Sequence, residues 1–461
     1  MEGTISRSAM EKMALCPRAR YLSYEWMRGL PVSLPSGETV IHCGGLSQAK
    51  PASALLTGSA VHEGFASLLA SCKRLDLGGE GWQSMRRDPN WHLQIDVAAQ
   101  TALTYFDRAA LEQGISFGLD PGAAEWYTSE QRALVEGLVW IAGLRLVPEL
   151  ISHYRIVDVE REERMELGAG VRPFAARADA LLAERDSGDL SVFSLKTGAM
   201  YGRKEEMKFK RDVQGLSEAI ALERRLNTRG PCACWTTGPE CCKNQPRQKI
   251  ATVQMALLIK GTRRLNEKAG RKEHYSPLTR AWRLMDPLTG IQQWAWSYDT
   301  PKVNAKTGES YIGKLGKDFT ATPAWEYPGG IRAWVLALDR GEIQGELGDA
   351  LAGCMAVPEP WARAESEMED WLEQALVQER EVEEGAEVVN LNLAAGNLSV
   401  ARRMLNIHFP QNRSACISYN QSCSFDAVCW GGQGLVQIAQ GFAPDGLKLR
   451  TDHHAEESEE E

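Results

Sequence analysis

The chain has 461 residues, of which 43% are hydrophobic and 25% charged, the balance of an ordinary soluble globular protein. Its net charge of -9 argues against a generally basic nucleic-acid coat protein, although a local basic groove remains compatible with it. We find no apolar run of about 18 residues and no signal-peptide core at the N-terminus. We therefore expect a cytoplasmic protein with no membrane partner.

Apolar periodicity predicts helices first, then strands, then helices again. Helices are expected at 5–28, with a local interruption at Pro17, and at 57–72, 93–114 and 125–148, with a loop at 31–53. Strands are expected at 153–166, 171–183 and 190–196, followed by a helix at 205–226 and strands at 249–260 and 290–298. A polar loop at 301–323 and helices at 329–341 and 358–384 complete the prediction. This order predicts an α/β (α+β) fold, a mixed core with additional helices around it.

The same order suggests a division of the chain. We expect an N-terminal helical region at 1–150, a central core at 151–300 with a cysteine-rich insert at 230–247, and a C-terminal helical region at 301–430 that ends in a cysteine cluster. The tail at 431–461 gives little structural signal. Its acidic end, AEESEEE, is a run of like charge that we expect to be disordered.

Two residues of the central strands suggest chemistry. In an expected hairpin with its turn near 187, Asp179 falls about opposite 195–196, so that Asp179 and Lys196 project into the same space. A carboxylate can hold Mg²⁺, and a lysine can stabilise the negative charge that develops on an attacked phosphate. The alternative is an ordinary pair on a solvated hairpin, which is common on sheets.

Further motifs resemble a known family. KTG at 196–198, with Asp179 seventeen positions upstream, resembles the core of RecB-like nucleases of the PD-(D/E)XK superfamily, including CRISPR-associated and phage-borne exonucleases. GSAVH at 58–62 resembles the family's G-x-x-x-H motif, and Gln214 fits the family's glutamine on the next helix. The resemblance implies a restriction-endonuclease-like fold, in which helices flank a central mixed sheet and extend from both ends of the core. It also implies Mg²⁺ or Mn²⁺ held by His62 and Asp179, and catalytic roles for Asp179, Lys196 and Gln214. A lone inward histidine is otherwise most often a core residue.

The sequence departs from the family at two positions. Ser194 stands where an acid is expected to share the metal, and Glu218 stands where an aromatic residue is expected. A hydroxyl is a poor Mg²⁺ ligand compared with a carboxylate. Replacement acids near in sequence are Asp212, Glu205, Glu206 and Glu160. Either an acid comes from elsewhere, or the site is degenerate and the protein only binds DNA.

Eleven cysteines in an expected cytoplasmic protein favour metal ligation over disulfides. Cys416, Cys423 and Cys429, together with Cys16 in a Cys-Pro pair, resemble the four ligands of a [4Fe–4S] cluster in RecB-like nucleases. Such a cluster would tie the two ends of the chain together, and zinc is the competing ion. A second group lies in the insert and could also hold Zn²⁺, or be incidental thiols; it comprises Cys232, Cys234, Cys241 and Cys242.

Basic residues follow the lysine motif. Lys204, Lys208, Lys210 and Arg211 suit contacts with DNA phosphates, although most charge runs are only solvated helix faces. The resemblance implies a metal-dependent DNA nuclease, specifically an exonuclease in recombination, repair or phage DNA processing, with a helicase or recombination protein as a partner. The rivals are a non-catalytic DNA-binding protein on the same fold and a zinc-dependent interaction protein with no DNA role.

Overall fold

The computed structural model of the protein describes residues 3–33, 39–48, 53–78, 82–112, 124–199, 201–210, 213–228, 249–261, 277–297, 299–345, 349–418, 421–430, 443–444 and 446–450. The first helices are α1 (Arg7–Leu15), α2 (Pro17–Arg20), a π-helical turn (Tyr21–Glu25), α3 (Ser53–Leu75), α4 (Trp82–Met85), α5 (Pro89–Glu112), α6 (Ala124–Ile141) and α7 (Val147–His153). The later helices are α8 (Arg203–Lys210), α9 (Val213–Thr228), α10 (Gly330–Asp339), α11 (Glu365–Ala394), α12 (Leu398–His408) and α13 (Asp426–Trp430).

A mixed sheet forms the centre of the molecule. Its strands are β1 (Ile5–Ser6), β5 (Tyr154–Met165), β6 (Phe174–Glu184), β7 (Leu190–Gly198), β8 (Ile250–Ile259) and β14 (Met355–Ala356). The pairs β5–β6, β6–β7 and β8–β14 are antiparallel, and the pairs β1–β6 and β7–β8 are parallel. The predicted mixed α/β architecture with a central mixed sheet is therefore confirmed.

Strand β6 has three partners. Strand β5 follows one of its edges. The other edge is shared by β7, which pairs from Ala180 to Ala183, and by β1, which pairs at Phe174 and Ala175. Among the residues that the structure describes, 176–179 pair with neither strand on that edge. On this edge of β6, residues 176–179 therefore separate the end of β1 from the end of β7. We call this gap between the two strands the fork, and the candidate site lies there.

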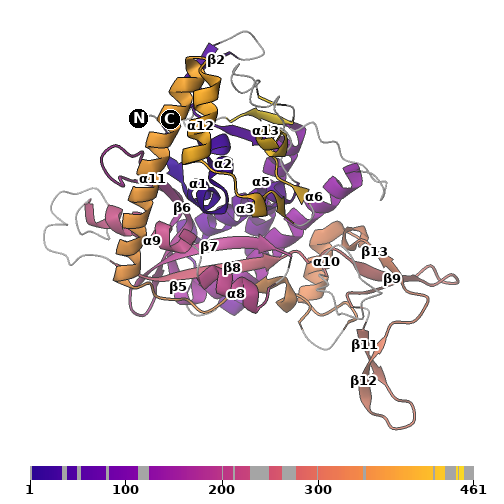
Figure 1. The fold of residues 1–461 in the computed structure, drawn as a ribbon. Helices are drawn as coiled ribbons and strands as arrows, with labels where there is room; N and C mark the ends of the chain where they lie inside the picture. Colours follow the sequence, from indigo (N-terminus) through magenta and orange to yellow (C-terminus); the bar gives the residue numbers. More distant parts are fainter. Residues whose placement is uncertain are drawn as a thin grey trace.

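Helices cover both faces of the sheet (Figure 1). Because successive strand residues point to opposite faces, Leu182 and Phe193 pack with α3, α5 and α6 in the largest core cluster. On the other face, Leu181 and Val192 pack against Leu222 of α9. The sheet is thus a middle layer, held rigidly between helices that can carry functional side chains.

The N-terminal segment packs against α11 and α12, which lie side by side (Figure 1). The rings of Tyr21 and Phe409 pack in a tilted arrangement, with centroids 4.9 Å apart, inside a shared core cluster. Fully buried Arg20 pairs with Glu25 at 3.0 Å and with Glu379 of α11 at 2.6 Å. Removing one member of such a buried network would leave a charge uncompensated, so the contact between the N-terminal segment and α11 is costly to disrupt.

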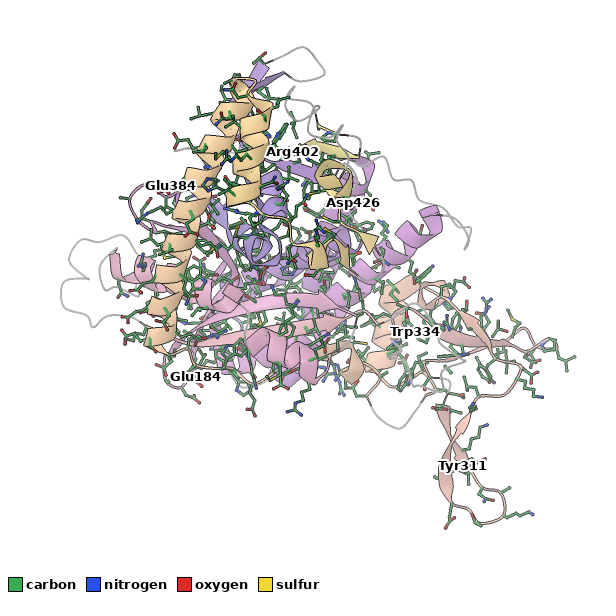
Figure 2. All side chains as sticks on the ribbon, in the orientation of Figure 1. Glu184, Tyr311, Trp334, Glu384, Arg402 and Asp426 are labelled. Atoms are coloured by element: carbon green, nitrogen blue, oxygen red, sulfur yellow. The ribbon has the colours of Figure 1, made fainter. Side chains whose placement is uncertain are left out.

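A smaller sheet lies beside the main body, with strand order β10 (Gln292–Ala295), β9 (Ala281–Met285), β13 (Thr320–Thr322). Trp334 of α10, labelled in Figure 2, is buried and donates its indole N–H to the Pro277 carbonyl at 2.7 Å. The strands β11 (Asp299–Val303) and β12 (Ser310–Lys314) form a hairpin that projects from this sheet and carries exposed Tyr311. The prediction of a loop at 301–323 was therefore wrong.

Three other sequence predictions need correction. The helix expected at 5–28 begins with strand β1 and changes direction at Cys16, whose φ of -160° is extended rather than helical. The helix expected at 358–384 starts at Glu365 and continues to Ala394. Helix α12 and the short strands β2 (Pro31–Ser33), β3 (Thr39–Ile41), β4 (Leu46–Gln48), β15 (Ile417–Ser418), β16 (Gln421–Ser422) and β17 (Leu447–Leu449) were not predicted. Within the described ranges, no helix combines the length and the apolarity that a bilayer crossing requires.

Candidate metal centre

Three side chains from three elements meet beside the fork. His62 of α3, Glu160 of β5 and Asp179 of β6 each offer a ligand atom, and these atoms lie within 4.8 Å of one another. The His62 Nδ1 and Asp179 Oδ1 atoms are 2.8 Å apart. One imidazole and two carboxylates form a donor set that suits a divalent cation such as Mg²⁺, Mn²⁺ or Zn²⁺.

The backbone brings Glu160 to this point. Val159 pairs with Ala180 and Arg161 pairs with Ala178, so Glu160 stands opposite Asp179. Its φ of 48° lies in the left-handed region that non-glycine residues rarely adopt. A strained backbone conformation of this kind persists only where the surrounding structure imposes it, and such residues are concentrated at functional sites. Arg177 Nε also holds the Glu160 Oε2 atom at 3.1 Å.

Glycine explains how α3 reaches the strands. A Cβ atom on Gly58 would lie 3.2 Å from the Thr197 hydroxyl oxygen, closer than most such contacts. Gly58 therefore allows α3 to approach β7 closely, and His62 follows one helical turn later on the same face. The two motifs GSAVH and KTG, far apart in the sequence, meet at this contact.

Burial and neighbouring charges shift the pKa values of all three ligands. Burial and the neighbouring Asp179 raise the pKa of Glu160 to about 7, although Arg177 opposes the increase. Burial also acts to raise the pKa of Asp179, but His62, Lys196 and the Leu195 N–H hold it below its usual value. In return, Asp179 raises the pKa of His62 against the opposing effect of burial. Near neutral pH, Glu160 therefore still holds a proton beside the ionised Asp179, and a divalent ion can replace that proton.

Asp179 also ends the pairing of β6 with β7. The last registered pair is Ala180 with Phe193, which places Asp179 opposite residue 194, one or two positions from the predicted 195–196. Beyond this pair the Leu195 N–H donates to the Asp179 Oδ2 atom instead of to a strand carbonyl. The carboxylate is thus fixed through both of its oxygens, by Leu195 and by His62.

A second acid, Glu218, is hydrogen-bonded to Ser194. The hydroxyl of fully buried Ser194 donates to Glu218 Oε2 at 2.6 Å, and Glu218 is 3% exposed. Burial raises the pKa of Glu218 to about 7, opposed by nearby Lys196 and by hydrogen bonds from Ser194 and Gln214. A carboxylate from α9 therefore reaches the strand position at which the family carries its own acid. The sequence signal was available, because Glu218 follows Gln214 by four residues on one helix.

The predicted catalytic residues Lys196 and Gln214 are in contact. The Lys196 ammonium donates to Gln214 Oε1, and Lys196 also acts electrostatically on both Asp179 and His62. The structure therefore places Asp179, Lys196, Gln214 and His62 around one point, as the sequence predicted. Of the other acids considered, Glu205 and Glu206 lie on α8 outside the ligand group, and Asp212 falls outside the described residues.

The predicted DNA-contacting residues lie on α8, which follows β7. Lys204, Lys208 and Lys210 are exposed there, and Arg211 falls outside the described residues. Lys210 pairs with Glu206 at 2.7 Å, one helical turn earlier. The helix expected at 205–226 is divided into α8 and α9, so these lysines belong to a separate short helix before Gln214.

The four cysteines expected to form a cluster also gather. The Cys423 N–H donates to the Cys416 carbonyl at 2.8 Å. Burial raises the pKa of the Cys429 thiol to about 11; Arg18 opposes this increase, whereas Cys423, Cys16 and Cys416 add to it. The four half-buried thiols are therefore close enough to influence one another, although no three of their sulfur atoms lie within 4.8 Å of one another. The second group, at 232–242, lies outside the described residues.

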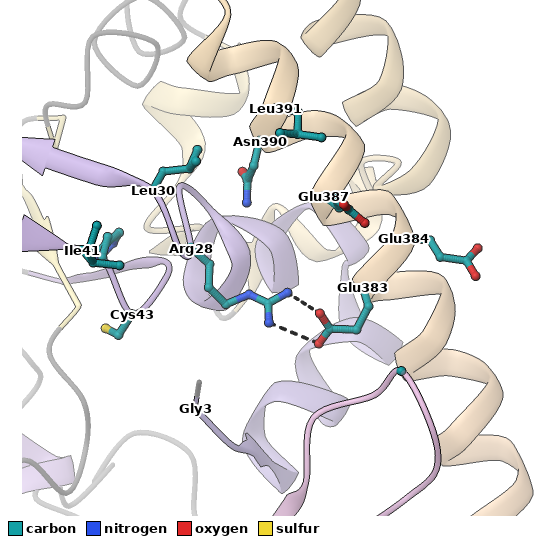
Figure 3. Close-up of a pocket in the computed structure, with 13 residues that line it drawn as sticks. Gly3, Arg28, Leu30, Ile41, Cys43, Glu383, Glu384, Glu387, Asn390 and Leu391 are labelled. Atoms are coloured by element: carbon teal, nitrogen blue, oxygen red, sulfur yellow. Dashed lines mark hydrogen bonds and ion pairs between the residues drawn. The ribbon is translucent and has the colours of Figure 1, made fainter. Parts of the chain in front are cut away.

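A separate cavity of about 720 Å³ lies between the N-terminal segment and α11 (Figure 3). Arg28 lies in the wall of this cavity and donates two hydrogen bonds, of 3.2 and 2.5 Å, to the Glu383 carboxylate. The ligand group and Lys196 are not part of its lining. It is therefore distinct from the candidate metal centre.

Comparisons with known proteins add no family assignment. No protein-family model matches the sequence, and no curated protein matches it.

Proposed function

We propose that this protein is a Mg²⁺- or Mn²⁺-dependent deoxyribonuclease, and specifically an exonuclease that acts in DNA recombination, repair or phage DNA processing. The observation that carries the proposal is the meeting of His62, Glu160 and Asp179, from three different elements, with Lys196 beside them. The motifs that resemble RecB-like nucleases supply His62, Asp179 and Lys196 in the expected order. A helicase or recombination protein is the partner that the resemblance implies.

Each residue has a defined task in this proposal. Asp179, Glu160 and His62 hold the divalent cation, so that Glu160 replaces the acid missing at Ser194. When bound, such a cation polarises the phosphate and lowers the pKa of a bound water. The Lys196 ammonium stabilises the negative charge that develops on the attacked phosphate.

Gln214 and Glu218 keep the lysine in place. Gln214 accepts a hydrogen bond from Lys196 and makes another with Glu218, which in turn accepts from Ser194. The ammonium therefore has a fixed position relative to Asp179. Preorganised charge of this kind is worth more in a partly buried site than in water.

The cysteine centre has a structural task. In this proposal Cys16, Cys416, Cys423 and Cys429 hold a [4Fe–4S] cluster, which the resemblance favours over zinc. The cluster would fasten the N-terminal segment to the C-terminal one, beside the buried Arg20 network. Exposed Lys204 and Lys208 on α8 are proposed to contact DNA phosphates.

The test is cleavage of end-labelled single- and double-stranded DNA in Mn²⁺ by the wild type, Lys196→Ala and the control Lys249→Ala. Lys249 is an exposed lysine that pairs with Glu365 at the surface. We expect Lys196→Ala to be slower by about 100-fold or more, the effect of removing one transition-state donor, and Lys249→Ala to match the wild type. Equal rates for Lys196→Ala and the wild type would refute the assignment.

A second candidate is a DNA-binding protein without catalysis, which Ser194 favours because a hydroxyl stands where the family carries an acid. The same experiment separates the two functions. DNA binding by the wild type with no cleavage in either Mg²⁺ or Mn²⁺ would establish this alternative. Failure to bind any DNA would contradict both.

A further inference from the structure

Helix α1 spans the distance between the candidate metal centre and the cysteine cluster. It begins at Arg7, directly after β1, which pairs with β6 on the edge that β7 leaves. It ends at Leu15, with Cys16 as its C-terminal cap and the Cys16 N–H bonded to the Lys12 carbonyl at 2.8 Å. A helix of nine residues is about 13 Å long. One short rigid element therefore has an end at each centre.

At its first end, the helix delivers a guanidinium to the proposed catalytic residues. Arg7 NH1 donates to Gln214 Oε1 at 2.5 Å, although 207 residues separate the two in the chain. The same oxygen accepts the Lys196 ammonium. A carbonyl oxygen has two lone pairs, so it can orient both donors at once. Gln214 is 9% exposed, which makes this arrangement costly to disturb.

At its other end, α1 is fixed by the C-terminal segment. The Asn412 side-chain amide donates to the Leu15 carbonyl at 2.7 Å. The Arg18 N–H donates to the Pro410 carbonyl at 3.3 Å, and Arg18 Nε donates to the Phe409 carbonyl at 2.8 Å. These contacts come from the segment that leads into Cys416, so they hold the helix and the cluster as one unit.

We propose that Arg7 is a positioning residue that fixes Gln214, and through it Lys196, and that α1 makes this position depend on the cysteine end of the helix. The inference rests on the proposed function for its catalytic meaning, but its mechanical part does not. Loss of a ligand thiol would release the C-terminal end of α1, shift Arg7 and loosen Gln214. A rigid secondary-structure element can carry coupling of this kind, and α1 contacts both regions.

The kinetic test is a double-mutant cycle with Arg7→Met, Gln214→Met and the double variant, with Arg340→Met as a control at an exposed arginine. We expect Arg7→Met to lower kcat about 10- to 100-fold with little change in KM, since a misplaced catalytic group costs rate. Arg7→Lys should recover part of the loss. In the Gln214→Met background, Arg7→Met should have no further effect, because the two act as one unit. Multiplying effects, or a change confined to KM, would overturn the role of Arg7.

The mechanical test uses no activity. Backbone hydrogen exchange at the start of α9 would be measured for wild type, Arg7→Met, Cys16→Ser and Asn412→Ala, which loosens the same helix end without removing a thiol. We expect faster exchange around Gln214 in all three variants, and no added effect of Asn412→Ala when Arg7→Met is already present. Unchanged exchange at α9 in Asn412→Ala would overturn the coupling, even if Cys16→Ser fails to fold. A wild type that cuts no DNA would refute the proposed function and leave this result standing.

Discussion

The most quantitative prediction concerns how stability depends on the charge of Glu218. This carboxyl group is only 3% exposed, and glutamine can replace it with nearly the same shape and no charge. The substitution Glu218→Gln keeps the shape and an oxygen that can accept from the Ser194 hydroxyl. It removes the charge that burial disfavours. The variant therefore isolates the cost of keeping an ionised carboxylate behind the proposed catalytic lysine.

The magnitude follows from the pKa. Folding raises the pKa of Glu218 from its ordinary 4.5 to about 7, chiefly through burial. At roughly 1.36 kcal/mol per pH unit this corresponds to about 3 kcal/mol. Since the folded state holds its proton more tightly, the contribution favours folding below pH 4.5 and is lost as the pH rises to about 7. We expect the stability advantage of Glu218→Gln over the wild type to grow from about 1 kcal/mol at pH 5 to about 3 kcal/mol at pH 8.

Urea unfolding followed by tryptophan fluorescence between pH 5 and 8 measures this difference. Glu184→Gln, at an exposed carboxylate near the end of β6 (Figure 2), is the control and should show no comparable rise with pH. A Glu218→Gln variant whose advantage stays constant across this range would show that Glu218 is ionised without cost. The argument about its environment would then be wrong.

Two further predictions concern packing and the cysteine centre. A Cβ atom on Gly215 would lie 2.4 Å from Val253 Cγ1. The variant Gly215→Val should therefore lower the free energy of unfolding, measured in urea, by roughly 1–3 kcal/mol or more. In the control Gly353→Ala the added Cβ meets no atom within 4 Å, so its effect on stability should be near zero. Anaerobically prepared wild type should absorb near 400 nm and contain iron. The variant Cys423→Ala should lose the absorbance and the iron, whereas the control Cys43→Ala should keep both. Wild type that contains zinc and no iron would contradict the iron–sulfur assignment.

Much of the site could be predicted from local sequence. Period-two alternation and the turn at 185–189 located β6 and β7, and therefore Asp179 and Lys196, because strand direction is a local property. Helical spacing predicted that His62 points inward, and the resemblance of GSAVH to a family motif singled it out as a ligand. The predicted pairing register of β6 with β7 was wrong by one or two residues, because the register depends on how many residues form the turn between them.

The sequence placed Glu160 among four candidate replacements for the missing acid, but it could not choose between them. Glu160 reaches the site only because β5 pairs with β6 in one register and turns through a left-handed residue there. These are tertiary properties with no local signal. Glu218 was visible four residues after Gln214, but its value depends on the contact between α9 and Ser194.

Other errors have similar causes. Strands β11 and β12 pair mainly with each other and remain exposed, so their polar sequence resembles that of a loop. Gly308, with a φ of 72°, marks the turn between them and was a signal that could have been used. The role of Arg7 was invisible because its partner Gln214 is 207 residues away.

The central claim is that His62, Glu160 and Asp179 form one divalent-cation site. Titration with Mn²⁺, followed by the electron paramagnetic resonance signal of the free ion, tests it directly. We expect the wild type to bind Mn²⁺ at this site, and both Asp179→Asn and Glu160→Gln to weaken binding by about tenfold or more, since each removes a direct ligand charge. The exposed control Glu184→Gln should bind as the wild type does. Unchanged Mn²⁺ binding in Asp179→Asn and Glu160→Gln would contradict the account.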